Sequence, residues 1–189
     1  MGQLRNTIRH IKSERQRRKA AGEDYSIHVL KEVLHADVAE IEFPPEGIRM
    51  PVNPNLRCKG VKVESCKVMG SHQVPLWLVF ENYDPTAAPV YIIFKDGDDV
   101  RQDTLVLQLF NIMQDTWEDD GLDIPLRPGT TGTYGCVSVG FEVGVVEVVT
   151  HCNTLAGIVK EAEKSALGVF DKVWLTSVQR CVAMPSAYS

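Results

Sequence analysis

The sequence predicts an α+β fold, in which N-terminal helices precede an antiparallel five-stranded sheet with one main packed helix. Three observations predict it. Apolar residues recur at helical spacing up to about residue 41, short segments rich in Val, Ile, Phe and Trp follow, and one long helical pattern interrupts these segments. With 189 residues, of which 44% are hydrophobic, the chain is large enough to bury a core.

The first helical pattern runs from Leu4 to about Lys19, with Leu4, Ile8 and Ile11 at helical spacing among many arginines and lysines. A basic amphipathic helix of this kind serves in organelle-targeting peptides and at anionic lipid surfaces. We favour a simpler interpretation, a solvated helix that packs a narrow apolar stripe on a neighbouring element. A second helical pattern covers residues 27–34 and gives way near Pro44 and Pro45, because consecutive prolines cannot continue a helix.

Residues 42–58 contain four prolines and are expected to form an extended, fairly stiff linker. The predicted strands are residues 60–69, 75–82, 91–95, 134–139 and 144–150. Helices are predicted at about residues 98–118 and 154–164. The chain therefore divides into a helical segment (1–41), the proline-rich linker (42–58), the sheet-containing lobe (59–160) and a tail without clean periodicity (161–189).

Composition excludes several classes of protein. A net charge of -5 gives no field that would favour nucleic acid. Five widely spaced cysteines, an odd number without a C-x-x-C pair, indicate reduced thiols in the cytoplasm. No apolar stretch reaches the roughly 18 residues of a membrane span, and Asn6 stands where an acylation motif requires Ser or Thr. We therefore expect a cytoplasmic protein, peripheral to the membrane when active.

The run from Val90 to Trp117 carries the main candidate site. Lys95 ends an apolar strand, and Asp103 heads an apolar stripe of the following helix. A carboxylate in that position is costly to bury unless a cation meets it, and Lys95 is the nearest candidate in sequence. We expect the two to form a buried pair in which Asp103 orients the lysine. The pair is either purely structural or, as we favour, presents the lysine to nucleotide phosphates.

Three other segments have a functional and a purely structural interpretation. The short turn at residues 69–74 matches no phosphate-loop motif, but its place before the Lys95 strand would let Ser71 donate to phosphate. In the structural interpretation residues 144–149 form a core strand. In the functional interpretation their backbone groups contact adenine. Tyr134 is a core tyrosine or a partner of Asp103.

Several motifs together resemble one family. They are C-K-V-M-x-S and P-L-W-L (residues 66–78), I-I-F-K-x-G-D-D-x-R-Q-D (92–103), L-x-L-Q (105–108), G-L-D (121–123) and Y-G-C-x-S-x-G (134–140). From about residue 43 to 158 the chain resembles the small lobe of the phosphoinositide 3-kinase catalytic subunit, and the spellings P-L-W-L, Y-G-C and V-E-V-V are closest to the class I type. The implied fold is a protein-kinase-like small lobe, with residues 1–41 as the end of a helical accessory domain.

The resemblance also implies roles for individual residues. Lys95 is the lysine on the ATP phosphates, supported by Asp103 and Tyr134, and Ser71 lies in the phosphate-covering loop. The pocket roof is Met69, Pro75 and Trp77, and the hinge is Glu147 and Val149. The implied cofactors are ATP and magnesium. The implied partners are ATP, a phosphoinositide lipid at the membrane surface and, as a candidate, a regulatory subunit.

The motifs that complete such a kinase are absent from these 189 residues, which contain neither D-R-H-x-x-N nor D-F-G. Phosphoryl transfer requires a positioned base and carboxylate-held magnesium. We therefore expect part of a lipid kinase, with no catalytic residue and no magnesium ligand of its own and no activity as this chain alone. The alternative is a catalytically inactive small lobe that acts as a binding or regulatory module.

Overall fold

The computed structural model describes residues 2–71, 73–122 and 134–150. The chain divides into two compact units, Met1–Val148 and Val149–Ser189, and every described element belongs to the first. Its helices are α1 (Gly2–Ala21), α2 (Ile27–Ala39) and α3 (Arg101–Asp119), with a short 3-10 helix, η1 (Val63–Ser65). Its strands are β1 (Ile48–Met50), β2 (Asn53–Val61), β3 (Lys67–Val68), β4 (Leu76–Asn82), β5 (Val90–Asp96), β6 (Cys136–Gly140) and β7 (Val143–Glu147). No described helix is both long and apolar enough to cross a membrane.

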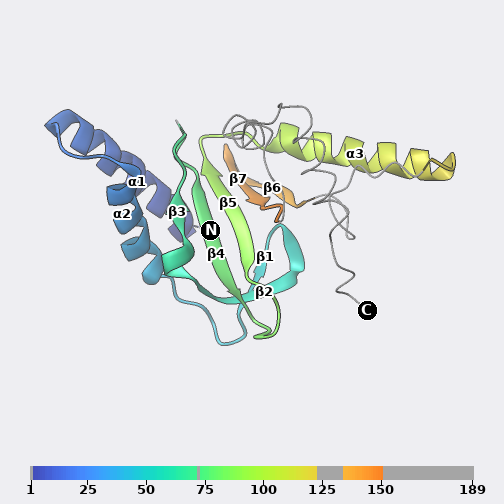
Figure 1. Cartoon of the computed structure of the whole chain (residues 1–189), viewed down its shortest axis with the longest axis horizontal. Coiled ribbons are helices and arrows are strands. Elements are labelled where there is room, and N and C mark those ends of the chain that lie inside the picture. Colours follow the sequence, from blue (N-terminus) through green and yellow to red (C-terminus); the bar gives the residue numbers. More distant parts are fainter. Residues whose placement is uncertain (1, 72, 123–133, 151–189) are drawn as a thin grey trace, which may run out of the picture. The chain divides into compact units, whose positions relative to one another are not determined.

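The strands form one antiparallel sheet in the order β1-β2-β4-β5-β7-β6, with β3 paired to β4 (Figure 1). The α+β class and the antiparallel sheet are confirmed, but the sheet has seven strands where five were expected. One reason is that residues 42–58, expected to be a linker, contain β1 and most of β2. Pro54 is tolerated there because it lies where the β1–β2 register shifts, so its missing N–H leaves the regular ladder intact. The other reason is that η1 interrupts the strand predicted at residues 60–69.

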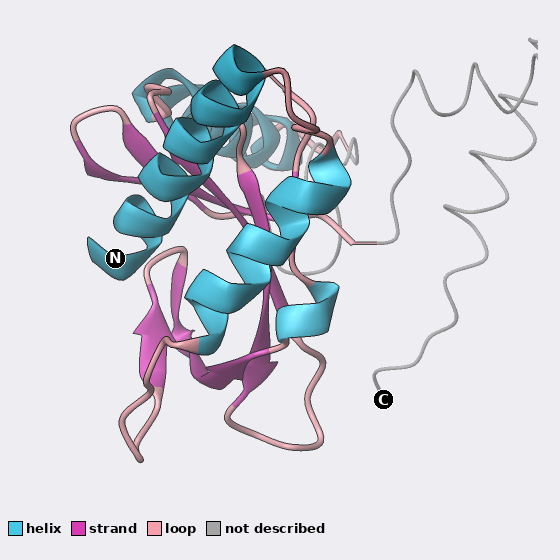
Figure 2. Cartoon of the chain, turned by 90° about the vertical axis from the view of Figure 1, so that its left-hand side faces the viewer, coloured by secondary structure: helices cyan, strands magenta, loops and turns pink. Residues whose placement is uncertain are grey.

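One face of the sheet carries the main core. Directly paired residues point to the same face of a sheet, and the paired residues Leu76, Phe94 and Val145 are all fully buried. They share one hydrophobic cluster with Ile8 of α1 and Leu34 of α2. Figures 1 and 2 show these two helices lying together over the sheet. The favoured interpretation of the first helix is confirmed, because its apolar stripe is buried while its basic side chains are exposed or half-buried.

The opposite face carries α3 over β6 and β7. Val100, immediately before α3, and Leu107 pack against Cys136. Gly144 of β7 permits this contact, because a Cβ there would overlap both γ carbons of Val100. The helix expected to be the main packed one makes only a small contact with the sheet, since Leu107 is its one buried residue among those described. Its exposed apolar residues are Leu105, Val106, Leu109, Phe110, Ile112 and Met113.

Three cysteines should resist alkylation in the native protein. Cys58, Cys66 and Cys136 are free thiols in the core, and burial raises the pKa of each, that of Cys58 to about 11. Because the thiolate is the nucleophile, the raised pKa alone slows Cys58 roughly 100-fold at about pH 8. Mass spectrometry after brief iodoacetamide treatment should find the three unmodified in buffer and modified in urea. Rapid native modification of Cys58 would contradict this packing.

Candidate functional site

Lys95 lies near the end of β5 and points to the sheet face opposite the main core. The buried residues Ile92 and Phe94 alternate with half-buried Ile93 and Lys95 along this strand. The Lys95 side chain retains 25% of its exposure, and its ammonium donates to the Asp98 carboxylate at 2.9 Å. Partial burial opposes the charge, but the bond to Asp98 and the nearby carboxylates outweigh it and raise the pKa of Lys95. The lysine is therefore held as a cation with part of its surface free.

The partner of Lys95 differs from the one expected. Asp103 is exposed near the start of α3 and makes no ion pair with Lys95, so the expected buried pair is wrong. The physical reason is the turn between strand and helix. Gly97 has a φ of +90°, which reverses the chain and brings Asp98 to the lysine before the helix begins. Asp103 acts only through its charge, which contributes to the raised pKa of Lys95.

The register brings one predicted residue, Trp77, and two residues that were not predicted onto the face of Lys95. Trp77 pairs with Ile93, and Ile93 pairs with Val146. All three are half-buried and lie on the same face as Lys95. Sequence reasoning identified Trp77 and missed Ile93 and Val146, although strand alternation from Lys95 would have indicated Ile93. The result is an apolar, partly open surface beside a cation.

The predicted roof residues lie in and beside the β3–β4 hairpin. The Met69 N–H donates to the Pro75 carbonyl at 2.9 Å, and Pro75 is buried at the level of Lys95, one residue before the Leu76–Phe94 pair. Ser71 is exposed, and its carbonyl accepts the Val74 N–H at 3.2 Å. Val74 has a φ of +54°, which is strained for a β-branched residue, and burial of its side chain holds it there. Val74 is thus held in place, and the Ser71 side chain lies at the surface.

Tyr134 and Glu147 lie at the other side of this face. Tyr134 packs against the cluster of Val100, Leu107 and Cys136, as a core tyrosine would, and makes no hydrogen bond to Asp103. The Glu147 carboxylate accepts the Gly135 N–H at 2.8 Å, and the Glu147 N–H donates to the Gly135 carbonyl at 2.7 Å. Its side chain is therefore occupied, and a hinge role falls to backbone groups. Val149 is half-buried just past β7, and the hinge role of both residues stays a prediction.

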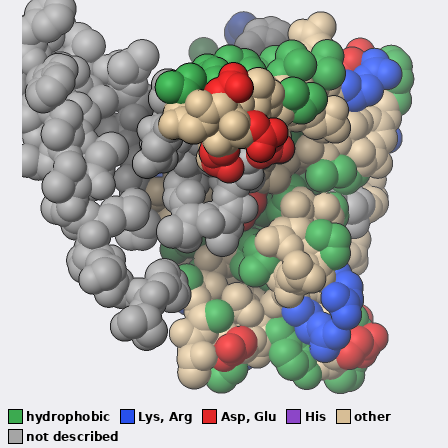
Figure 3. All heavy atoms as spheres, turned by 90° about the vertical axis from the view of Figure 1, so that its right-hand side faces the viewer, with side chains coloured by type: hydrophobic (Ala, Val, Ile, Leu, Met, Phe, Trp, Pro, Cys, Tyr) green, Lys and Arg blue, Asp and Glu red, His purple; other side chains and the backbone are tan. Residues whose placement is uncertain are grey.

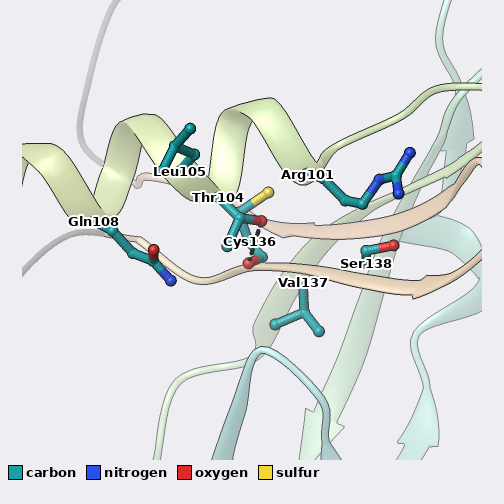
Figure 4. A pocket seen from close by; sticks show the side chains of 7 residues that line it. All are labelled: Arg101, Thr104, Leu105, Gln108, Cys136, Val137 and Ser138. Atoms are coloured by element: carbon teal, nitrogen blue, oxygen red, sulfur yellow. Dashed lines mark hydrogen bonds between the residues drawn. The ribbon is translucent and has the colours of Figure 1, made fainter.

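A groove of about 390 Å³ lies between α3 and the edge strand β6 (Figure 4). Its floor includes Cys136 and Ser138, and Thr104 donates to the Cys136 carbonyl across it at 3.1 Å. None of the predicted nucleotide contacts lines it. Within the described ranges, no group of three or more His, Cys, Asp or Glu side chains is placed to hold a metal ion.

Comparison with known proteins places the chain in a family. A family model described as phosphatidylinositol 3- and 4-kinase matches residues 89–188, more than half of the chain. The chain belongs to this family. It is a partial phosphatidylinositol 3- and 4-kinase domain, which confirms the resemblance given by the motifs. The match begins just before β5, includes Lys95 and extends to residue 188, past residue 158, where the resemblance was expected to end.

Three relatives come from Dictyostelium discoideum. Phosphatidylinositol 3-kinase 2 is 37% identical over 159 residues, which are 84% of this chain and 8% of that protein. Phosphatidylinositol 3-kinase 1 is 36% identical over 140 residues, 74% of this chain and 8% of that protein. Phosphatidylinositol 3-kinase 3 is 37% identical over 128 residues, 68% of this chain and 7% of that protein. The chain spans less than a tenth of the length of these relatives.

Proposed function

We propose that this chain forms the lysine-bearing wall of the ATP site in a phosphatidylinositol 3-kinase, which transfers the γ-phosphate of ATP to a phosphoinositide lipid. The observation that carries the proposal is the position of Lys95 in a member of this family. Its ammonium is charged, oriented by Asp98 and partly exposed on an apolar sheet face. That arrangement suits a nucleotide, which presents a flat base and a polyanionic tail.

Each group on this face has a role in the proposal. Lys95 donates to phosphate oxygens, and Asp98 keeps it charged and aimed. Trp77, Ile93 and Val146 supply apolar area for the base. Ser71 offers a hydroxyl at the turn, and backbone groups near Glu147 and Val149 meet the adenine edge. Asp103 acts at longer range, through its charge.

Magnesium and the catalytic base are assigned outside the described residues. Magnesium, when bound, would supply neutralisation of the charge that develops on the transferred phosphate. The described part of the chain contains no carboxylate cluster suited to it, so we derive no step through the metal from these residues. This chain contributes positioning and charge stabilisation. In phosphoryl transfer these effects account for most of the catalysis.

The substrate determines where the kinase acts. Phosphoinositides reside in membranes, so we propose a cytoplasmic protein that works at the membrane surface, without a spanning element among the described helices. A regulatory subunit is a further proposed partner. The class I assignment rests on the residues found in the motifs P-L-W-L, Y-G-C and V-E-V-V, and it stays a prediction.

The test is Lys95→Met in the protein that carries the whole kinase domain. We expect at least a roughly 100-fold loss of phosphoinositide phosphorylation, because one preorganised donor to a developing charge commonly contributes that much. Radiolabelled lipid product would be measured by chromatography, with the thermal unfolding midpoint as a check of folding. Lys59→Met is a matched control, since Lys59 is exposed on β2.

Two results would overturn the proposal. Retained turnover in folded Lys95→Met would remove the lysine from the phosphate site. Absence of lipid phosphorylation by the unmodified protein would favour the alternative function, a binding or regulatory module without catalysis.

A further inference from the structure

Helix α1 makes polar contacts with the sheet on the face opposite the candidate phosphate-binding lysine. Asp96 follows Lys95 and points to the α1 side of the sheet. Its carboxylate lies 3.2 Å from Nε of Arg5 and 3.6 Å from Nε of Arg9. The basic residues of α1 therefore have a specific target at the end of β5, in addition to their contact with solvent.

Lys12 joins two elements that are far apart in sequence. Its ammonium donates to the Asp96 carbonyl at 2.5 Å and to Oε1 of Gln73 at 3.4 Å. Gln73 belongs to the β3–β4 turn, and Asp96 ends the strand of Lys95. One side chain on α1 thus links the turn proposed to cover the phosphates to the strand proposed to contact them.

The chain after Asp96 transmits this contact to Lys95. Gly97 has a φ of +90°, and a Cβ there would lie 3.0 Å from Oε1 of Gln73. The N–H groups of Gly97 and Asp98 donate to the Glu142 carbonyl at 2.7 and 3.2 Å. Asp98 then pairs with Lys95. The turn is therefore held by Lys12 from α1 and by Glu142 from the β6–β7 connection, and it fixes the carboxylate that aims the lysine.

The covering turn has a second contact from the same helix. Nη1 of Arg15 donates to the Ser71 carbonyl at 3.5 Å. Arg15 and Lys12 lie three residues apart on α1 and so project from the same side of the helix. The buried Val74, with its strained φ of +54°, holds the other end of the turn. Ser71 is therefore held by α1 and Val74 by the core.

We propose that Lys12 is a positioning residue for ATP, which sets the spacing between the β3–β4 turn and the Lys95 strand from behind the sheet. The proposal rests on the proposed function, because it requires that Lys95 and this turn meet the phosphates. Lys12 touches no nucleotide. Substitution of Lys12 changes none of the residues predicted to contact ATP. It lets the β3–β4 turn and the Lys95 strand move apart by a small distance, and both ATP binding and the reaction geometry are sensitive to such a shift.

The test uses Lys12→Met in the protein that carries the whole kinase domain. We expect KM for ATP to rise about 10-fold, with KM for the lipid and the thermal midpoint nearly unchanged. Lys12→Arg, which keeps a donor, should return KM for ATP to within about 2-fold of the unmodified value. Lys19→Met is the matched control on the same helix, since Lys19 is exposed in its last turn, and it should change neither KM.

Gln73→Leu removes the other partner of Lys12 and gives an independent measurement. Because both substitutions break one bridge, their effects on KM for ATP should be clearly less than additive in the double variant. Should Lys12→Met lower the thermal midpoint, Gln73→Leu alone tests the proposal by the same rise in KM.

The outcomes separate this proposal from the proposed function. An inactive Lys95→Met together with an unchanged KM for ATP in Lys12→Met and Gln73→Leu would overturn the positioning role alone. An equal fall in activity toward both substrates, unrescued by Lys12→Arg, would mark Lys12 as merely structural and also overturn it. A fully active Lys95→Met would overturn the function first.

Discussion

Replacing Phe94 with alanine is expected to lower the free energy of unfolding by about 3–5 kcal/mol. Phe94 is fully buried on β5, between Leu76 and Val145 in the register and beneath the N-terminal helices. Truncation removes transfer energy and leaves a cavity that the paired strands cannot close. The free energy of unfolding of a single domain is about 5–15 kcal/mol, so the loss is a large fraction of its stability.

Urea unfolding followed by circular dichroism would measure the effect. Phe141→Ala is the matched control, because Phe141 is 77% exposed at the β6–β7 turn. That variant should stay within about 0.5 kcal/mol of the unmodified protein. Similar losses in the two variants would mean that Phe94 is not in the core.

Ile8→Ala is expected to cost about 2–5 kcal/mol and to shift one cooperative transition for the whole unit. Ile8 is fully buried and shares its cluster with Leu34 of α2 and with Phe94 of the sheet. Helices that share a core with a sheet should unfold together with it. Denaturation monitored both by helical ellipticity and by tryptophan fluorescence would test this, since Trp77 lies in β4.

Ile27→Ala is the control for this variant, because Ile27 is 48% exposed at the start of α2, and it should cost less than about 1 kcal/mol. Separate transitions in Ile8→Ala, with only the ellipticity shifted, would show that residues 1–41 unfold independently of the sheet. The boundary at residue 41, predicted as the end of an accessory domain, depends on this result.

The order of elements was predictable because local periodicity specifies helices and strands. Residues 91–95 are a short apolar run that ends in a lysine, and β5 forms almost as expected. The strand residues between 48 and 58 were not predictable in the same way. Their prolines indicate a linker, and only pairing with β4 and the bulge at Pro54 make a strand there favourable.

The candidate site was predictable in its lysine and not in its carboxylate. Lys95 stands out because a cation ends an apolar strand. Asp103 lies on a helical stripe and therefore looked buried, whereas the choice of Asp98 depends on the positive φ of Gly97, which two adjacent aspartates in the sequence do not reveal. The contacts of Lys12 with Asp96 and Gln73 span 84 and 61 residues and are visible only in three dimensions.

Helix α3 has a practical consequence for handling the protein. Figure 3, which looks toward the C-terminal end of α3, shows hydrophobic side chains at the surface beside acidic ones, and Ile112 and Leu105 are 60% and 56% exposed. Monomeric proteins seldom expose a large contiguous apolar surface to water. Such a surface promotes aggregation as the protein concentration rises. The purified protein should be kept at low micromolar concentration. Light scattering should show that it is monomeric before a thermal unfolding curve is interpreted.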